Sequence, residues 1–132
     1  VLPWLEKLLP ADGTKILGFT TDHIFTHDEK RGPWGVLGLG VVGGKSNVIS
    51  SFRASKGVDA NGTRERIVKT AVHEVGHNFG LEHCTQTPTC LMSDAKGKVA
   101  SLDQEQDFCP VCRAEFAKQG VKMPDKPEKP SK

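Results

Sequence analysis

The stretch VHEVGHNFGLEHCTQTPTCLM, residues 72–92, holds three histidines and two cysteines within eighteen positions. Its first part continues a helical pattern from residue 63, in which four apolar side chains share one face: Val68, Val72, Val75 and Phe79. We expect a helix over residues 63–79, with Thr63 as its N-cap. Gly80 can adopt the left-handed conformation that ends a helix and turns the chain.

The histidines of this stretch have the spacing of a metal site. His73 and His77 are one helical turn apart, so both imidazoles can bind the same ion. Glu74 is offset by about 100° around the helix axis and can lie beside the ion. If Gly80 turns the chain back, His83 becomes a third ligand. The alternative is a surface helix with unrelated histidines, but five fixed positions in eleven residues favour a zinc hydrolase site.

The four cysteines form two pairs, Cys84 with Cys90 and Cys109 with Cys112. This spacing favours a tetrahedral zinc site with four thiolate ligands. Two other hypotheses stay open. The cysteines could form two disulfides, although four in 132 residues is sparse for a disulfide scaffold. The Cys-Pro-Val-Cys motif could be a redox site, although no thioredoxin-like pattern surrounds it.

Taken together, the motifs HEVGHNFGLEHC, TQTPTCLM and CPVC resemble the archaemetzincin family of zinc metallopeptidases, in the metzincin clan. The family pattern HExxHxxGxxHC, C-x-M and CxxC is matched in order by His73, Glu74, His77, Gly80, His83, Cys84, Cys90, Met92, Cys109 and Cys112. Two spacings differ from the family by one residue each: five residues instead of four precede Cys90, and sixteen instead of seventeen follow Met92. Both lie in segments that we expect to be irregular, where one residue is easily absorbed.

The resemblance implies an α+β, zincin/metzincin-like fold, with a small twisted mixed sheet packed on helices above the active-site helix. It implies two zinc ions: a catalytic one held by His73, His77 and His83, and a structural one held by the four cysteines. Met92 would lie on a turn beneath the catalytic zinc. The adjacent His83 and Cys84 would serve different ions, because neighbouring side chains on an extended backbone point to opposite sides.

The activity implied is zinc-dependent hydrolysis of a peptide bond, with Glu74 as general base and a peptide or protein as substrate. In metzincins the strand before the active-site helix borders the cleft and pairs with substrate. The resemblance therefore implies that residues 47–53 bind substrate, with these candidates: Asn47, Val48, Ile49, Ser50 and Ser51. The competing hypothesis is a non-catalytic, zinc-stabilised peptide-binding module, against which Glu74 argues. A hydrolase that acts on other bonds is a second alternative.

We expect one domain over residues 1–120, with an upper subdomain to about residue 80 and a zinc-stabilised, irregular lower subdomain over about 81–120. Residues 121–132, rich in proline and lysine, should form a disordered tail. The runs 15–26, 33–44 and 45–55 are strand-like, and Pro10 closes a short helical segment. Pro110 should open a last short helix that Gly120 ends.

The charge distribution excludes some partners. The net charge is only +2 and the basic residues are scattered, which argues against nucleic acid. No apolar run approaches the ~18 residues of a membrane span, and we expect a monomer. Because Val1 rather than Met opens the chain, we expect a processed form or a fragment. The compartment stays open, although cysteines that bind zinc favour the cytoplasm.

A glycine pattern and a histidine pair have simpler explanations than a binding site. Gly38, Gly40 and Gly43 match a dinucleotide fingerprint, but a strand-like segment follows them instead of a helix, so we interpret them as turns and bulges. His23 and His27 lie four residues apart in a strand-like stretch, where this spacing does not bring their rings together. We expect both histidines to be solvated.

Overall fold

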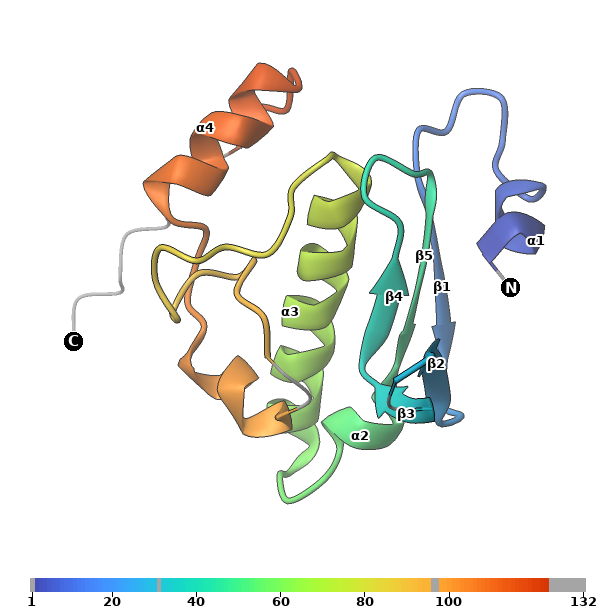
Figure 1. Ribbon diagram of the computed structural model, residues 1–132, viewed down its shortest axis with the longest axis vertical. Helices are drawn as coiled ribbons and strands as arrows, with labels where there is room; N and C mark the ends of the chain where they lie inside the picture. Colours follow the sequence, from blue (N-terminus) through green and yellow to red (C-terminus); the bar gives the residue numbers. More distant parts are fainter. Residues whose placement is uncertain (1, 31, 96–97, 124–132) are drawn as a thin grey trace.

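The computed structural model describes residues 2–30, 32–95 and 98–123. It has an α+β fold in which one long helix lies between a small sheet and an irregular C-terminal part (Figure 1). The elements in chain order are α1 (Leu2–Glu6), β1 (Ile16–Thr20), β2 (Ile24–Asp28), β3 (Gly32–Val36), β4 (Gly38–Gly40), β5 (Ser46–Ser50), α2 (Ser51–Ala54), α3 (Ala60–Asn78), the 3₁₀ helix η1 (Val99–Gln104) and α4 (Pro110–Lys118). No helix among these described residues is long and apolar enough to cross a bilayer.

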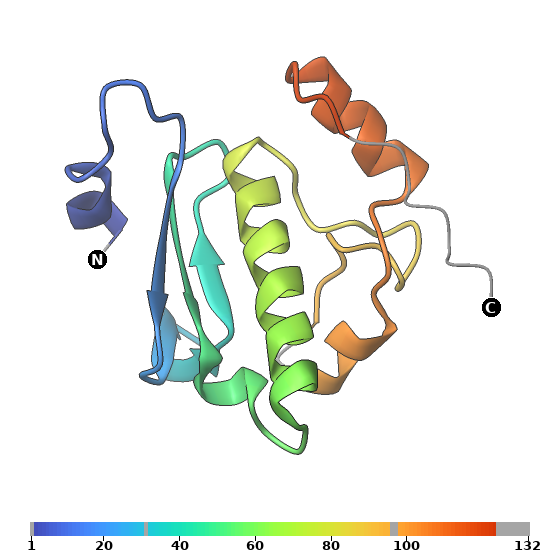
Figure 2. The same cartoon turned by 180° about the vertical axis from the view of Figure 1, so that it is seen from behind.

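The main sheet has three strands in the order β1-β5-β4. Strand β1 runs parallel to β5, and β4 runs antiparallel to it with Gly38 opposite Ile49 and Gly40 opposite Asn47. Strands β2 and β3 form a separate antiparallel hairpin. Helices α1 and α3 lie on opposite sides of the main sheet, as the view from behind also shows (Figure 2). The sheet is therefore mixed, and β4 is its edge strand on the side of the site described below.

In the stretch expected to bind substrate, residues 47–53, Arg53 lines the cleft described below, but the five named candidates do not: Asn47, Val48, Ile49, Ser50 and Ser51. Strand β5 lies in the middle of the sheet, so its backbone already pairs with β1 on one side and β4 on the other. The side chains of Asn47, Ile49 and Ser50 are buried. The prediction of an exposed edge here was wrong, because the strand order depends on long-range pairing that local pattern does not reveal.

The stretch 45–55, expected as strand, changes to helix in its middle. The Ser50 hydroxyl accepts a hydrogen bond from the Phe52 N–H at 3.1 Å and so acts as the N-cap of α2. Serine at this position satisfies a backbone donor that the first turn of a helix leaves unpaired. The strand therefore ends at Ser50.

Helix α3 begins earlier than the apolar pattern indicated. Its N-cap is Asp59, whose carboxylate accepts a hydrogen bond from the Gly62 N–H at 2.8 Å. Thr63 lies inside the first turn and its hydroxyl donates to the Asp59 carbonyl at 2.9 Å, so the prediction of Thr63 as N-cap was wrong. The predicted C-terminal end is confirmed, because Gly80 has φ of +95°.

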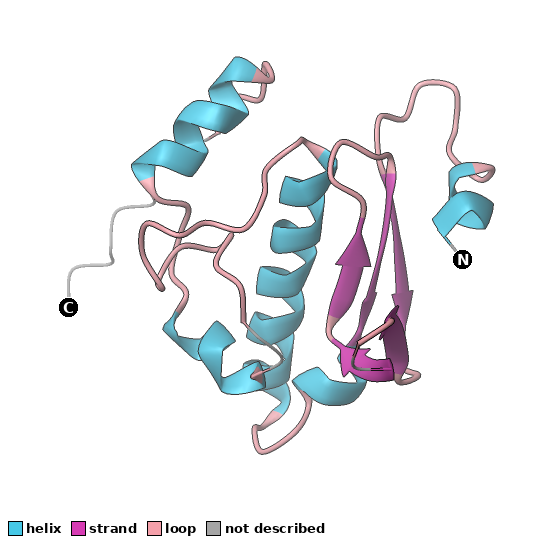
Figure 3. Cartoon of the chain, viewed as in Figure 1, coloured by secondary structure: helices cyan, strands magenta, loops and turns pink. Residues whose placement is uncertain are grey.

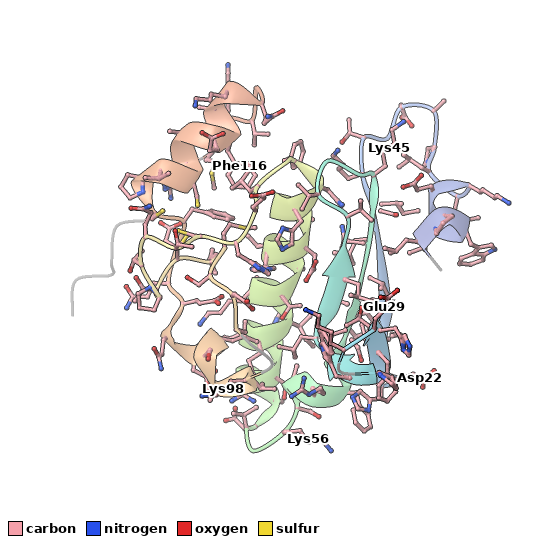
Figure 4. All side chains as sticks on the ribbon, in the orientation of Figure 1. Asp22, Glu29, Lys45, Lys56, Lys98 and Phe116 are labelled. Carbon is pink, nitrogen blue, oxygen red and sulfur yellow. The ribbon has the colours of Figure 1, made fainter. Side chains whose placement is uncertain are left out.

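The described residues of the C-terminal part, 81–95 and 98–123, are mostly loop (Figure 3). Its core is a buried cluster of Leu81, Cys90, Leu91, Met92, Phe108, Cys109, Cys112 and Phe116. Phe116 of α4, labelled in Figure 4, packs edge-on against Phe79 and Phe108, with ring centroids 6.1 and 4.8 Å apart. Val121 and Met123 lie against this cluster. The rest of the expected tail, 124–132, lies outside the described residues.

One buried arginine ties the C-terminal part to the helix. The Arg66 guanidinium donates two hydrogen bonds to the Asp103 carboxylate, at 3.0 and 2.8 Å. It also donates to the carbonyls of Ala54 and Lys56. Two parallel hydrogen bonds fix both distance and direction, so η1 is held at a defined place beside α3.

We predict that Asp59→Ala lowers the free energy of unfolding by about 1 kcal/mol, because the first turn of α3 loses its side-chain cap. Urea unfolding followed by circular dichroism measures the change. Thr63→Ala serves as the comparison and should cost less. A larger loss for Thr63→Ala than for Asp59→Ala would contradict the assignment of the cap.

Candidate metal centre and cleft

Two backbone carbonyls orient the histidines of α3. The Nδ1 of His73 lies 2.7 Å from the carbonyl oxygen of Leu91, and the Nδ1 of His77 lies 2.7 Å from that of Leu81. A carbonyl oxygen only accepts, so each Nδ1 must carry the proton and donate it. In a neutral imidazole the lone pair then lies on Nε2. Both rings are therefore set to bind a metal through Nε2.

The two Nε2 atoms face each other at 3.0 Å. Burial, more than any other effect, lowers the pKa of His73 to about 4 and also lowers the pKa of His77, so both rings are neutral at pH 7. Two lone pairs at this distance repel, and no hydrogen bond joins them when both protons are on Nδ1. A cation between them removes the repulsion, and the donor set fits zinc.

The turn at Gly80 brings His83 to the same place. Its ring centroid lies 5.3 Å from that of His73 and 4.9 Å from that of His77. One nitrogen of each of the three rings lies within 4.8 Å of the others. His83 is half-exposed, and its Nδ1 lies 3.8 Å from the Asp94 carboxylate. The three predicted ligands thus come together, with one open side toward solvent.

Glu74 lies next to these histidines but outside their donor group. The residue is only 7% exposed, and burial raises the pKa of its carboxyl to about 8. Strand β4 passes directly over it: a Cβ at Gly38 would lie 2.8 Å from the Glu74 Cγ, and one at Gly40 would lie 2.9 Å from its Oε2. The two glycines therefore permit the strand to touch the carboxylate.

The four cysteines also gather at one point, with all four sulfur atoms within 4.8 Å of one another. Cys84 Sγ lies 3.6 Å from Cys109 Sγ, and Cys90 Sγ lies 3.7 Å from Cys112 Sγ. A tetrahedral zinc with bonds of about 2.3 Å to sulfur would place its ligands about 3.8 Å apart. All four thiols are free, and backbone N–H groups of Met92 and Cys109 point at Cys90 Sγ. The donor set and its spacing fit zinc.

Met92 is fully buried against the helix between the two sites. A Cβ at Gly76 would lie 2.4 Å from its sulfur, so α3 has no room for a side chain there. The Met92 carbonyl accepts a hydrogen bond from the Cys84 N–H at 2.8 Å. The segment that carries Met92 thus joins the cysteine cluster to the carbonyl of Leu91 that orients His73.

A cleft of about 1060 Å³ opens in front of the histidines. One wall is formed by β3 and β4, the floor by α3, and the other wall by these residues of the C-terminal part: Ser93, Asp94, Ala95, Leu102 and Glu105. His23 also lines the cleft, and its ring stacks on Phe52 with centroids 4.4 Å apart. The expectation of a fully solvated ring was wrong for His23, which is partly buried with its ring packed against Phe25 and Phe52. His27 is exposed, and among the described residues neither histidine belongs to a group of three or more possible metal ligands.

The comparisons with known proteins agree with this geometry. The sequence model of peptidase family M54 matches residues 8–118. The chain belongs to this family. It is 34% identical over 112 residues to an archaemetzincin of Haloquadratum walsbyi, covering 77% of this chain and 61% of that protein. The chain thus spans less than two thirds of the length of this M54 relative.

Solved structures of M54 relatives share the fold. An archaemetzincin from Methanopyrus kandleri matches with a TM-score of 0.74 at 26% identity, covering 89% of this chain and 63% of that one. An archaemetzincin from Archaeoglobus fulgidus, solved with malonate, matches with a TM-score of 0.66 at 34% identity, covering 83% and 64%. The α+β, metzincin-like architecture expected from the sequence is confirmed.

Several residues and backbone groups at this M54 site were not identified from the sequence. The carbonyls of Leu81 and Leu91 carry no residue-type signal, because any residue has one. Gly38 and Gly40 do have a signal: glycines two apart lie on the same face of a strand, which indicates a close approach by another element. Glu105 lies 31 residues after Glu74, with no motif to connect them.

We predict that Gly38→Ala destabilises the protein by about 1–3 kcal/mol, because its Cβ would overlap Glu74. The cost should shrink in a Glu74→Ala background, where the overlapping Cγ is gone. Denaturant unfolding of the four proteins gives the coupling free energy. Additive costs in this cycle would show that β4 does not press on Glu74.

Proposed function

We propose that this chain is a zinc-dependent peptidase in which His73, His77 and His83 hold the catalytic ion and Glu74 acts as general base. One observation carries the proposal: two carbonyl-held imidazoles present their Nε2 atoms 3.0 Å apart, beside a buried carboxylate that is not part of the donor group. Structural zinc sites close all four positions with ligands and have no need of such a carboxylate.

When bound, zinc would supply a Lewis acid that activates water and polarises the scissile carbonyl. Glu74 would take the proton of the attacking water and deliver it to the leaving amine. Its burial suits both steps, since a carboxyl whose pKa lies near neutrality both accepts and returns a proton. The carbonyls of Leu81 and Leu91 would hold the imidazoles in place throughout.

We place the substrate along β4 rather than β5. Leu37, Gly38 and Leu39 line the cleft, and β4 is paired on one side only among the described strands. An extended peptide could add to this edge by main-chain hydrogen bonds, which suits a peptidase that must hold its substrate extended. Gly38 and Gly40 let the strand approach Glu74 closely, so the scissile peptide bond would lie close to the Glu74 carboxylate.

We further propose that Cys84, Cys90, Cys109 and Cys112 bind a second, structural zinc. The C-terminal part has little regular structure, and metal binding would contribute to its folding. We also propose that the chain forms a single domain with a zinc-stabilised lower part. It would be a monomer that acts on peptides and has no nucleic-acid or membrane partner. We place it in the cytoplasm, where thiols stay reduced.

The second candidate function is a zinc-stabilised peptide-binding module, which would keep both metals but would not catalyse hydrolysis. The exposed edge of β4 and the size of the cleft are compatible with it. Glu74 separates the two functions, because a receptor would not depend on its proton transfer.

We predict that Glu74→Gln lowers kcat for a fluorogenic peptide by roughly 10²–10⁴-fold, the usual contribution of a positioned general base. Zinc content should stay the same, as measured by elemental analysis, because Glu74 is not a ligand. His77→Ala is the control and should lose zinc and activity together. If the wild type with zinc in the three-histidine site binds peptides and cleaves none, the binding module replaces the peptidase.

We predict two zinc ions per chain, with the cysteine-bound ion held more tightly because thiolates are the softer ligands. Mild chelation should remove one ion and the activity while the far-ultraviolet circular dichroism persists. Cys109→Ser should lower the melting temperature and increase proteolysis between residues 84 and 112 first. Two disulfides in the mass spectrum of fresh protein that contains no zinc would refute the second site.

A further inference from the structure

We propose that Glu105 forms a subsite of the cleft that selects a basic side chain, arginine or lysine, of the substrate. The inference rests on the proposed peptidase function and names the class of peptide on which it would act. It comes from a buried carboxylate that the chemistry of hydrolysis does not use.

Glu105 is almost fully buried yet lacks a partner. Only 2% of the residue is exposed, and its Oε2 has no hydrogen-bond partner among the residues that the structure describes. The residue nevertheless lines the same cleft as His73 and Glu74. Buried carboxylates are normally hydrogen-bonded, so an unsatisfied one facing a cleft indicates a ligand that completes it.

The nearest cation does not take this role. Lys69 lies on α3 close enough for its charge to favour the ionised form of Glu105, but its ammonium donates to the Leu102 carbonyl at 2.9 Å. Burial outweighs this charge and raises the pKa of Glu105 to about 8. Lys69 therefore does not offset the cost of burying the ionised Glu105 carboxylate, and a hydrogen-bond donor from the substrate would stabilise this charged form.

The wall around Glu105 favours a cation over an anion. Asp94 lies on the same wall, and Glu74 lies on the floor. A substrate carboxylate would find three acidic side chains and gain no favourable charge from them, whereas a guanidinium or ammonium can donate hydrogen bonds to carboxyl oxygens and favours their ionised form. Arg53 also lines the cleft, but its guanidinium already donates to the Gly35 carbonyl at 2.7 Å.

The neighbours of Glu105 also match the stem of a long basic side chain. Leu102, whose carbonyl accepts the Glu105 N–H, and Thr70 both line the cleft, and the Thr70 hydroxyl already donates to the Arg66 carbonyl at 2.8 Å. What Thr70 and Leu102 offer is thus mainly apolar surface. Arginine and lysine bury their methylene stems on apolar surface while their charged ends reach a polar group.

The backbone holds Glu105 in place before any ligand arrives. Its N–H donates to the Leu102 carbonyl at 3.1 Å, and the N–H of Gln106 donates to the Thr89 carbonyl at 2.9 Å. The ion pair of Asp103 with Arg66 fixes the preceding turn to α3. A preorganised carboxylate loses little entropy on binding and so discriminates well.

The test uses quenched fluorogenic peptides that carry one arginine at successive positions around the cleaved bond, each paired with a peptide in which citrulline replaces it. Citrulline keeps the shape of arginine and removes its charge. At one position, kcat/KM of the zinc-loaded wild type should be at least about tenfold higher for the arginine peptide than for the citrulline peptide. A charge-assisted hydrogen bond is strong enough to give such a difference. Glu105→Gln should bring this ratio near one.

Glu65→Gln is the matched control, because Glu65 is an exposed residue of α3 that does not line the cleft. It makes the same change of charge and should leave the arginine-to-citrulline ratio as in the wild type. Binding of the same peptides to a Glu74→Gln protein, followed by fluorescence anisotropy, reports the preference without turnover. Adding Glu105→Gln to that protein should abolish the preference.

The outcomes separate the two proposals. A wild type that cleaves both peptides of every pair equally well overturns the subsite, even if Glu105→Gln fails to fold. A preference that survives Glu105→Gln overturns it as well and assigns the selection to another acid. If no peptide is cleaved but anisotropy shows a Glu105-dependent preference for arginine, the subsite stands and the peptidase fails. No cleavage and no preference overturn both.

Discussion

The site depends on two hydrogen bonds between imidazoles of α3 and backbone carbonyls that follow the helix, His73 with Leu91 and His77 with Leu81. They fix the tautomer of each ring and point both Nε2 atoms at one place. The carbonyls belong to the loop-rich C-terminal part, so the metal site forms only when that part is folded. A helix alone would carry the same histidines with free rings and no defined site.

The cysteine cluster and the Arg66–Asp103 ion pair position the irregular C-terminal part from two ends. Cys84 follows His83 directly, and its N–H bonds to the Met92 carbonyl next to Leu91. The geometry of the sulfur cluster is therefore transmitted to the histidines through a few covalent bonds. At the other end the ion pair holds η1 and the wall that contains Glu105. The cleft has a stable shape because both ends of its loop wall are attached to α3.

The opposite wall is set by packing rather than by polar contacts. Gly38 and Gly40 let β4 touch Glu74, and this contact both buries the carboxylate and keeps the strand edge close to the histidines. Desolvation then raises the pKa of the Glu74 carboxyl. A glycine pattern that resembles a nucleotide fingerprint thus has a different physical reason, the close approach of a strand to a helix.

The sequence by itself determined which side chains gather at the candidate metal site, because a helix places His73, His77 and Glu74 by its own period and Gly80 ends it in a conformation that turns the chain back. It also determined the family, through spacings that local geometry imposes. The tertiary structure alone decided which strand borders the cleft: β5 has the stronger strand pattern, yet pairing on both sides hides it, and the short strand β4 becomes the edge. It alone placed Glu105 in the same cleft as Glu74, because two residues 31 positions apart come to line one cleft only through the folding of the chain between them.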